Sequence, residues 1–162
     1  MSSLVEPGTL YVVATPIGNL ADITARALEV LATVETVYAE DTRVTHKLLE
    51  RYQITTPLRS YREAAGGSQV QRMLSEVVDD LTSGKNLAYC SDAGTPGISD
   101  PGNYLVDTVR GAGLRVVPVP GPSSMVALLS VAGFVAQRPL LVGFLPKKKG
   151  HQTLRASCEK LW

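Results

Sequence analysis

Two carboxylates and a guanidinium stand next to one another in the segment AEDTR, residues 39–43. A carboxylate at this place could hold a ribose hydroxyl, as in dinucleotide-binding domains, or Glu40, Asp41 and Arg43 could form a polar cluster that faces a substrate. The first interpretation is weak because the chain has ATPIGN, not G-x-G-x-x-G, after its first predicted strand. Asp41 or Thr42 could also act simply as the N-cap of a helix.

Loops rich in glycine and proline carry a second chemical signal. They are ATPIGN (14–19), SDAGTPGISDPG (91–102) and PGPSS (120–124). Glycine lets a backbone approach a ligand closely, proline fixes the loop shape in advance, and free N–H groups at helix starts can hold polar or anionic groups. Each loop alone could be a tight turn, but their predicted position at one sheet edge indicates a binding site.

Other reactive side chains give weaker signals. His46 and His151 are expected on the surface, and Cys90 is expected to be a small buried residue. No spacing of His, Cys, Asp or Glu matches a metal site, so we expect none. The lysine run 147–149 could be a solvated turn, or it could contact phosphates if it flanks the ligand edge.

The elements that must position these residues alternate between strand and helix patterns. Strands are predicted at 9–14, 36–40, 57–61, 86–91, 114–120 and 139–144, and helices at 23–34, 45–52, 68–81, 103–113 and 123–132. Strands that are joined by helices run parallel. The sequence therefore predicts an α/β fold, with a mostly parallel sheet of five to six strands flanked by helices, which brings the three loops to one edge.

Composition bounds the class of protein. The chain has 162 residues, of which 44% are hydrophobic, and its net charge is +1. A chain of this kind can bury a core, which argues against a disordered nucleic-acid-binding tail. No apolar run approaches the length of a membrane span, the N-terminus lacks the basic start of a signal peptide, and there are only two cysteines. We expect a cytoplasmic protein with no membrane contact.

At these loops the sequence resembles a known family. The motifs LYVVATPIGNLADIT, AEDTR, SDAGTPGISDPG, VPVPGPSS and GFLPKKK occur in this order over residues 9–149. This pattern is similar to the ribosomal RNA small-subunit methyltransferase I family, within the tetrapyrrole-methylase-like (class III) methyltransferases. The resemblance implies the cofactor S-adenosylmethionine, and a reaction in which its methyl group is transferred to a ribose 2′-hydroxyl of a cytidine in small-subunit (16S) ribosomal RNA.

The resemblance also implies roles for particular residues. The cofactor would contact these positions: Pro16, Asp92, Ala93, Gly94, Thr95, Ile98, Ser123 and Ser124. Glu40, Asp41 and Arg43 would face the substrate, to position RNA or to take the hydroxyl proton. A ribose hydroxyl is a poor nucleophile, so a nearby carboxylate would help, and Glu40 or Asp41 is the expected base. The partners implied are the ribosomal RNA and a second copy of the chain in a homodimer.

Domain organisation follows from the same resemblance. Residues 1–142 would form an N-terminal domain for cofactor and substrate, and residues 143–162 a linker and the start of a truncated second domain. The segment SYREAAGGSQ, residues 60–69, departs from the histidine- and asparagine-bearing segment usual in the family. The substrate contacts that the family makes from this loop are therefore not expected here.

Two other functions remain open at this point. The chain could use the same cofactor to methylate a tetrapyrrole or corrin small molecule. It could also be an inactive, truncated domain that serves dimerisation or RNA binding.

Overall fold

The computed structural model describes residues 6–61, 67–98, 100, 102–135 and 137–141. The chain divides into two units, residues 1–132 and 133–162, and the fold below belongs to the first. In the second unit, residues 137–141 contain no strand, so the predicted strand 139–144 is absent over 139–141. Its remaining residues, the lysine run and the whole segment 143–162 lie outside the described residues.

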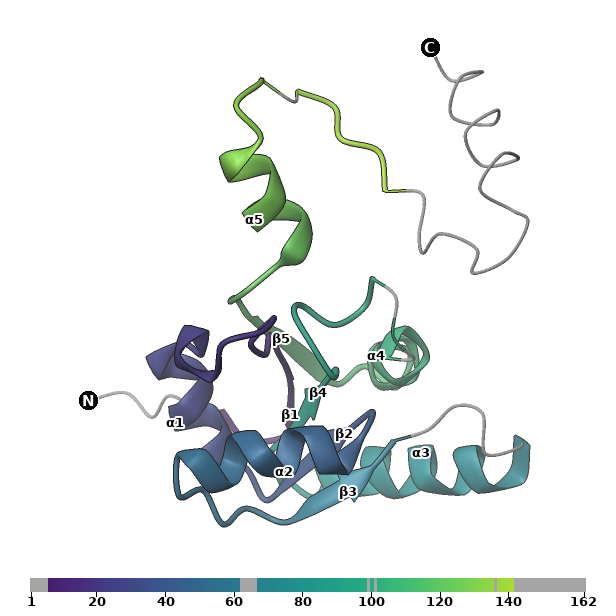
Figure 1. Cartoon of the computed structure of the whole chain (residues 1–162). Coiled ribbons are helices and arrows are strands. Elements are labelled where there is room, and N and C mark those ends of the chain that lie inside the picture. The colour runs from purple at the N-terminus through teal and green to yellow at the C-terminus, as the bar shows by residue number, and fades with distance from the viewer. Residues whose placement is uncertain (1–5, 62–66, 99, 101, 136, 142–162) are drawn as a thin grey trace. The chain divides into compact units, whose positions relative to one another are not determined.

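A parallel sheet forms the centre of the first unit (Figure 1). Its strands are β1 (Thr9–Val13), β2 (Thr36–Ala39), β3 (Leu58–Ser60), β4 (Leu87–Cys90) and β5 (Arg115–Val119). The order across the sheet is β3-β2-β4-β1-β5, and every pair is parallel. This arrangement confirms the predicted α/β fold. The number of strands in the described residues is five, the lower of the two expected.

A helix follows each strand. They are the 3-10 helix η1 (Leu20–Asp22), and the α-helices α1 (Ala25–Thr33), α2 (Thr42–Arg51), α3 (Gly67–Thr82), α4 (Gly102–Gly111) and α5 (Ser124–Val131). Thr24 caps α1 by accepting a hydrogen bond from the Ala27 N–H at 3.1 Å. α2 begins three residues earlier than predicted, because Asp41 caps it.

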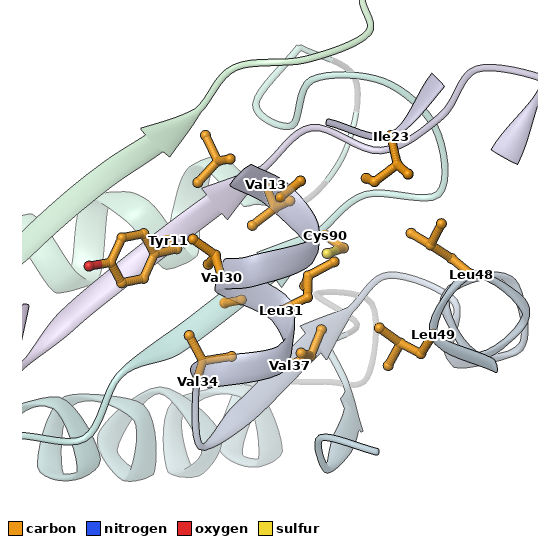
Figure 2. Close-up of a cluster of buried hydrophobic side chains, with 13 residues drawn as sticks. Tyr11, Val13, Ile23, Val30, Leu31, Val34, Val37, Leu48, Leu49 and Cys90 are labelled. Atoms are coloured by element: carbon orange, nitrogen blue, oxygen red, sulfur yellow. The ribbon is translucent and has the colours of Figure 1, made fainter. Parts of the chain in front are cut away.

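Two hydrophobic cores lie on opposite faces of the sheet. On one face, α1 and α2 pack against β1, β2 and β4, and the core includes Val30, Leu31 and Leu48 (Figure 2). On the other face, α3 and α4 cover Leu87 and Tyr89 of β4. All four residues of β4 are buried, as expected of a central strand that is covered on both faces.

The last helix of the unit differs from the others. α5 buries none of its residues, and Val126, Leu128 and Val131 are exposed. Most of the side chains of α5 are apolar. The helix that the sequence predicted is therefore present, but it has no buried face within the described residues.

The connections diverge at the carboxyl edge of the sheet. The chain leaves β4 toward α4 on one face, whereas it leaves the neighbouring strands β1 and β2 toward α1 and α2 on the other face. Such divergence opens a crevice beyond the strand ends, which is where open α/β sheets bind ligands.

The start of α4 gives a test of this packing. A Cβ at Gly102 would lie 2.3 Å from Cε1 of Tyr89 and 2.7 Å from Oδ1 of Asp100, whereas a Cβ at Gly111, the last residue of α4, would meet nothing within 4 Å. Gly102→Ala should therefore lower the free energy of unfolding by about 1–3 kcal/mol. Gly111→Ala should leave it unchanged or raise it slightly. Urea unfolding followed by circular dichroism measures both, and equal midpoints would contradict the packing.

Candidate functional site

The loop that follows β4, residues 91–102, lies at the centre of the carboxyl edge and is called the central loop here. Its described residues form hydrogen bonds to the loops that follow β1, β2 and β5. The three predicted ligand loops are therefore brought together with the AEDTR segment, as the sequence predicts.

An isolated antiparallel bridge joins the central loop to the loop after β1. The Thr15 N–H donates to the Gly94 carbonyl at 2.9 Å, and the Gly94 N–H donates to the Thr15 carbonyl at 3.0 Å. Gly94 has φ +81°, and a Cβ there would lie 3.3 Å from the Ile17 side chain. Glycine is needed at this position because of both its left-handed backbone and the close approach of the two loops.

Side-chain hydroxyls extend these ties. Thr15 Oγ1 donates to the Ser91 carbonyl at 3.1 Å, and both residues are buried. Thr95 Oγ1 donates to the Pro122 carbonyl at 3.1 Å, which connects the central loop to the loop after β5. Ser123 follows as the N-cap residue of α5, yet its side chain makes no capping hydrogen bond.

Reciprocal hydrogen bonds join the central loop to the AEDTR segment. The Asp41 N–H donates to Asp92 Oδ1 at 2.9 Å, and the Asp92 N–H donates to Glu40 Oε2 at 3.3 Å. Each segment thus holds a carboxylate of the other in place through a backbone amide. The pair fixes the Glu40 carboxylate beside the central loop.

The two carboxylates of AEDTR have different environments. Asp41 caps α2 by accepting the Arg43 N–H at 2.9 Å, and it also forms an ion pair with the Arg43 side chain. The capping role considered from the sequence is therefore real. Burial raises the pKa of Glu40, the Asp92 N–H partly opposes this, and the charges of Asp92, Asp100 and Asp41 raise it further. The surroundings thus raise the pKa of Glu40, whereas the Asp41 carboxylate is engaged by the start of α2 and by the Arg43 side chain.

Asp100 shapes the far end of the central loop, and the sequence analysis did not single it out. Its Oδ1 accepts from the Tyr89 hydroxyl at 2.9 Å and from the Gly102 N–H at 2.9 Å, and its Oδ2 accepts from the Gly97 N–H at 2.6 Å. Burial and the nearby Asp100 charge raise the pKa of Tyr89, so its hydroxyl stays a donor. An aspartate shortly before a helix start is a capping pattern, and this signal could have identified it.

A cavity of about 360 Å³ opens beside the central loop. We call it the edge pocket; its lining residues are Thr15, Pro16, Ile17, Gly18, Asn19, Leu20, Val44, Thr45, Leu48, Ser91, Asp92 and Ala93. Of the residues predicted to bind the cofactor, Pro16, Asp92 and Ala93 line it. The contributions of η1 and α2 to this wall were missed, because no motif marks the apolar side chains of Leu20, Val44 and Leu48.

The remaining predicted cofactor residues lie outside the lining of the edge pocket. They are Gly94, Thr95, Ile98, Ser123 and Ser124. Ile98 is 47% exposed although it is apolar, and Ser124 is exposed at the start of α5. Gly94, Thr95 and Ile98 belong to the central loop, which also supplies Asp92 and Ala93 to the edge pocket, and Thr95 is hydrogen-bonded to Pro122, which directly precedes Ser123.

Other side chains with chemical potential have ordinary environments. Cys90 is fully buried, and burial raises its pKa to about 12, so the thiol is an inert core group. The side chain of His46 is 68% exposed. Within the described parts of the chain, no cluster of His, Cys, Asp and Glu could hold a metal ion, and none of the helices has the length and hydrophobicity to cross a membrane.

The raised pKa of Glu40 leads to a pH-dependent prediction. An acid whose pKa is higher in the folded state costs stability when it ionises, and this cost grows as pH rises from the ordinary value of 4.5 through the folded pKa. Glu40→Gln should therefore be more stable than the wild type near neutral pH. The difference should vanish well below the ordinary value, where both side chains are neutral.

Urea unfolding over a series of pH values measures this difference. If Glu40→Gln proved less stable than the wild type at neutral pH, the folded protein would stabilise the ionised form of Glu40. That result would contradict a raised pKa.

Sequence comparison gives close relatives. The chain is 49% identical over 142 residues to a ribosomal RNA small subunit methyltransferase I from Xylella fastidiosa, covering 88% of this chain and 50% of that protein. It is 50% identical over 151 residues to the protein with the same name from Neisseria meningitidis, covering 93% of this chain and 50% of that protein. The chain spans about half the length of these curated relatives.

Solved structures share the fold at lower identity. The uroporphyrin-III C-methyltransferase of Thermus thermophilus superposes with a TM-score of 0.57 at 23% identity, covering 81% of this chain and 54% of that one. A cobalt precorrin-4 methyltransferase superposes with a TM-score of 0.56 at 20% identity, covering 82% and 53%. At these identities the likeness concerns the fold alone.

The family comparison agrees with the sequence motifs and with the fold. Residues 9–161 match the family described as Tetrapyrrole (Corrin/Porphyrin) Methylases, which is nearly the whole chain. With its parallel sheet, its central loop and its methyltransferase relatives, the chain belongs to the tetrapyrrole (corrin/porphyrin) methylase family.

Proposed function

We propose that this chain supplies the cofactor loop and the proton acceptor for transfer of a methyl group from S-adenosylmethionine to a ribose 2′-hydroxyl of a cytidine in small-subunit ribosomal RNA. One observation carries the proposal: the reciprocal hydrogen bonds of Glu40, Asp41 and Asp92 join the acidic segment to the central loop. The RNA substrate is supported by relatives at 45–50% identity that are named as ribosomal RNA methyltransferases.

The central loop has features that fit S-adenosylmethionine. Ile98 offers an exposed apolar surface, and the Ser123 side chain makes no capping bond at the start of α5. Gly94 keeps side-chain atoms away from the point where the loops after β1, β4 and β5 converge. Thr95 and Ser124 complete this group. When bound, the cofactor supplies an electrophilic methyl group, and the protein mainly orients it.

Glu40 is the proposed proton acceptor. Its Oε2 accepts the Asp92 N–H, while its Oε1 makes no hydrogen bond to the described residues. Oε1 would accept the proton of the 2′-hydroxyl as the oxygen attacks, and a raised pKa brings the carboxylate closer to the working range of a general base. Asp41 and Arg43 would position the RNA, since the Arg43 side chain is 82% exposed at the start of α2.

The tetrapyrrole alternative is supported by the description of the family and by solved structures. The uroporphyrin-III and cobalt precorrin-4 enzymes are named for small-molecule methylation, but they are only 23% and 20% identical to this chain, against 49% for an RNA methyltransferase. A non-catalytic role in dimerisation or RNA binding is a further alternative. Each of these functions gives a different result in one assay.

The assay measures transfer of labelled methyl from S-adenosylmethionine to small ribosomal subunits or to uroporphyrinogen III. We expect label in the ribosomal RNA alone, and a decrease of roughly 10²–10⁴-fold in Glu40→Gln. Glu50→Gln is the control, because that side chain is 74% exposed on α2. The full-length Neisseria meningitidis relative is the positive reference.

Label in the tetrapyrrole alone would reverse the substrate assignment. If wild type and Glu40→Gln transferred methyl at the same rate, Glu40 would not be the base. If the reference were active and this chain inactive, the non-catalytic role would be favoured.

Cofactor binding has its own prediction. Ile98→Ala removes an exposed apolar side chain from the central loop and should weaken binding of S-adenosylmethionine about tenfold, since roughly 1–2 kcal/mol of apolar contact is lost. Val44→Ala is the matched control, because Val44 is 42% exposed and lies on α2. Isothermal titration calorimetry measures both affinities, and equal losses in the two variants would argue against the cofactor group.

The homodimer, the cytoplasmic location and the domain boundary after residue 142 stay predictions. Multi-angle light scattering of the 162-residue chain would measure its oligomeric state.

A further inference from the structure

Apart from Pro16, Asp92 and Ala93, which were predicted to contact the cofactor, the residues that line the edge pocket have no assigned function. It is lined by the loop after β1, by α2 and by the start of the central loop, and its volume of about 360 Å³ is at the lower end of ligand pockets, roughly 300–1,000 Å³. Ile17, Leu20, Val44 and Leu48 give it mainly apolar walls. A pocket of this size and polarity suits one flat ring with its sugar rather than an extended chain.

A polar side chain in this wall lacks a partner among the described residues. Thr45 is 2% exposed, and its Oγ1 makes no hydrogen bond to any of them. A buried hydroxyl without a partner costs roughly 1–3 kcal/mol, so it commonly indicates a ligand or a water. Asp92 also lines the pocket, and its Oδ1 accepts the Asp41 N–H. The pocket thus combines apolar walls with a hydroxyl and a carboxylate that can pair with polar ring edges.

The location of the pocket relates it both to the proposed proton acceptor and to residues predicted to contact the methyl donor. Asp92 lines the pocket, and its N–H donates to the Glu40 carboxylate. A single residue therefore contacts both the pocket and the proposed proton acceptor. Of the residues predicted to contact the cofactor, Pro16, Asp92 and Ala93 line the pocket, whereas Gly94, Thr95, Ile98, Ser123 and Ser124 do not, so the pocket adjoins the predicted cofactor site without containing most of it. Donor and acceptor must meet at about 3 Å for transfer, and two neighbouring sites that share the central loop satisfy this.

We propose that the edge pocket holds the unstacked base of the nucleotide whose ribose is methylated; this inference rests on the proposed function. Enzymes that modify a nucleotide commonly take its base out of the stack and hold it between apolar side chains, with hydrogen bonds to its edge. A carboxylate accepts from the exocyclic amine of cytosine, and Asp92 offers one. Arg43 directly precedes Val44, which lines the pocket, and its exposed guanidinium would contact an RNA phosphate.

Nuclear magnetic resonance on the 162-residue chain tests the site directly. The probes are cytidine 5′-monophosphate and, separately, S-adenosylmethionine, at concentrations up to roughly 10 mM, where weak fragment binding is detectable. Cytidine monophosphate should shift the methyl signals of Val44 and Leu48, and S-adenosylmethionine those of Thr95 and Ile98. The proposal is overturned if S-adenosylmethionine shifts Val44 and Leu48 and the nucleotide does not, or if the nucleotide shifts neither.

Matched variants sharpen the test. Val44→Trp places a large ring at the pocket, whereas His46→Trp adds the same ring to the same helix at a residue that does not line it. Val44→Trp should abolish the nucleotide shifts at Leu48 and leave binding of S-adenosylmethionine unchanged, and His46→Trp should change neither. Thr45→Val should keep the fold and weaken nucleotide binding about fivefold, since one hydrogen bond is worth about 1 kcal/mol.

Failure of the pocket and failure of the reaction give different results. If Val44→Trp methylated ribosomal RNA as well as His46→Trp does, the pocket assignment would be wrong and the reaction would stand. If the nucleotide bound at Val44 and Leu48 without methyl transfer, the pocket would stand and the proposed reaction would be wrong.

Discussion

The hydrogen bonds between the central loop and its neighbours are the constraint on which the rest of the site depends. Backbone groups of Thr15, Gly94, Asp41 and Asp92 pair across loops rather than with solvent. Such pairing is possible only because β4 lies between β1 and β2, which brings the three strand ends to one edge. Asp100 adds three further hydrogen bonds at the far end of the loop. A loop held on every side keeps its shape before a ligand arrives, and this reduces the ordering cost of binding.

The acidic segment shows how one environment separates two adjacent carboxylates. Asp41 is satisfied by a helix start and an arginine, and it stabilises α2. Glu40 is partly buried among like charges, and ionising it is unfavourable. A carboxylate with a raised pKa, held beside a ligand loop, is the pattern expected where chemistry rather than stability determines the residue. The edge pocket repeats this pattern with the buried hydroxyl of Thr45, which has no partner among the described residues.

Patterns with a clear period or a clear backbone requirement were predictable from the sequence. The strand and helix alternation indicated the α/β fold, and the glycine- and proline-rich loops indicated the binding edge. The reciprocal pairing of Glu40 and Asp92 was not predictable, because the two residues are 52 positions apart and only the strand order β2-β4-β1 brings them together. Val44, Thr45 and Leu48 read as ordinary positions of an amphipathic helix. Their second role appears only when η1 and the central loop close the space beside them.

The strand order also has a consequence for how the chain folds. β1 and β2 are consecutive in the sequence, yet β4 separates them, so neither can complete its pairing until residues 87–90 have been synthesised. Pairings of such long sequence separation form slowly, because the loop-closure entropy is lost before contacts are gained. Until β4 inserts, the edges of β1 and β2 that it will occupy have unpaired backbone groups, which can template wrong pairings with other chains. β4 organises the site, and the time before it inserts is also when a nascent chain is most exposed to misassembly.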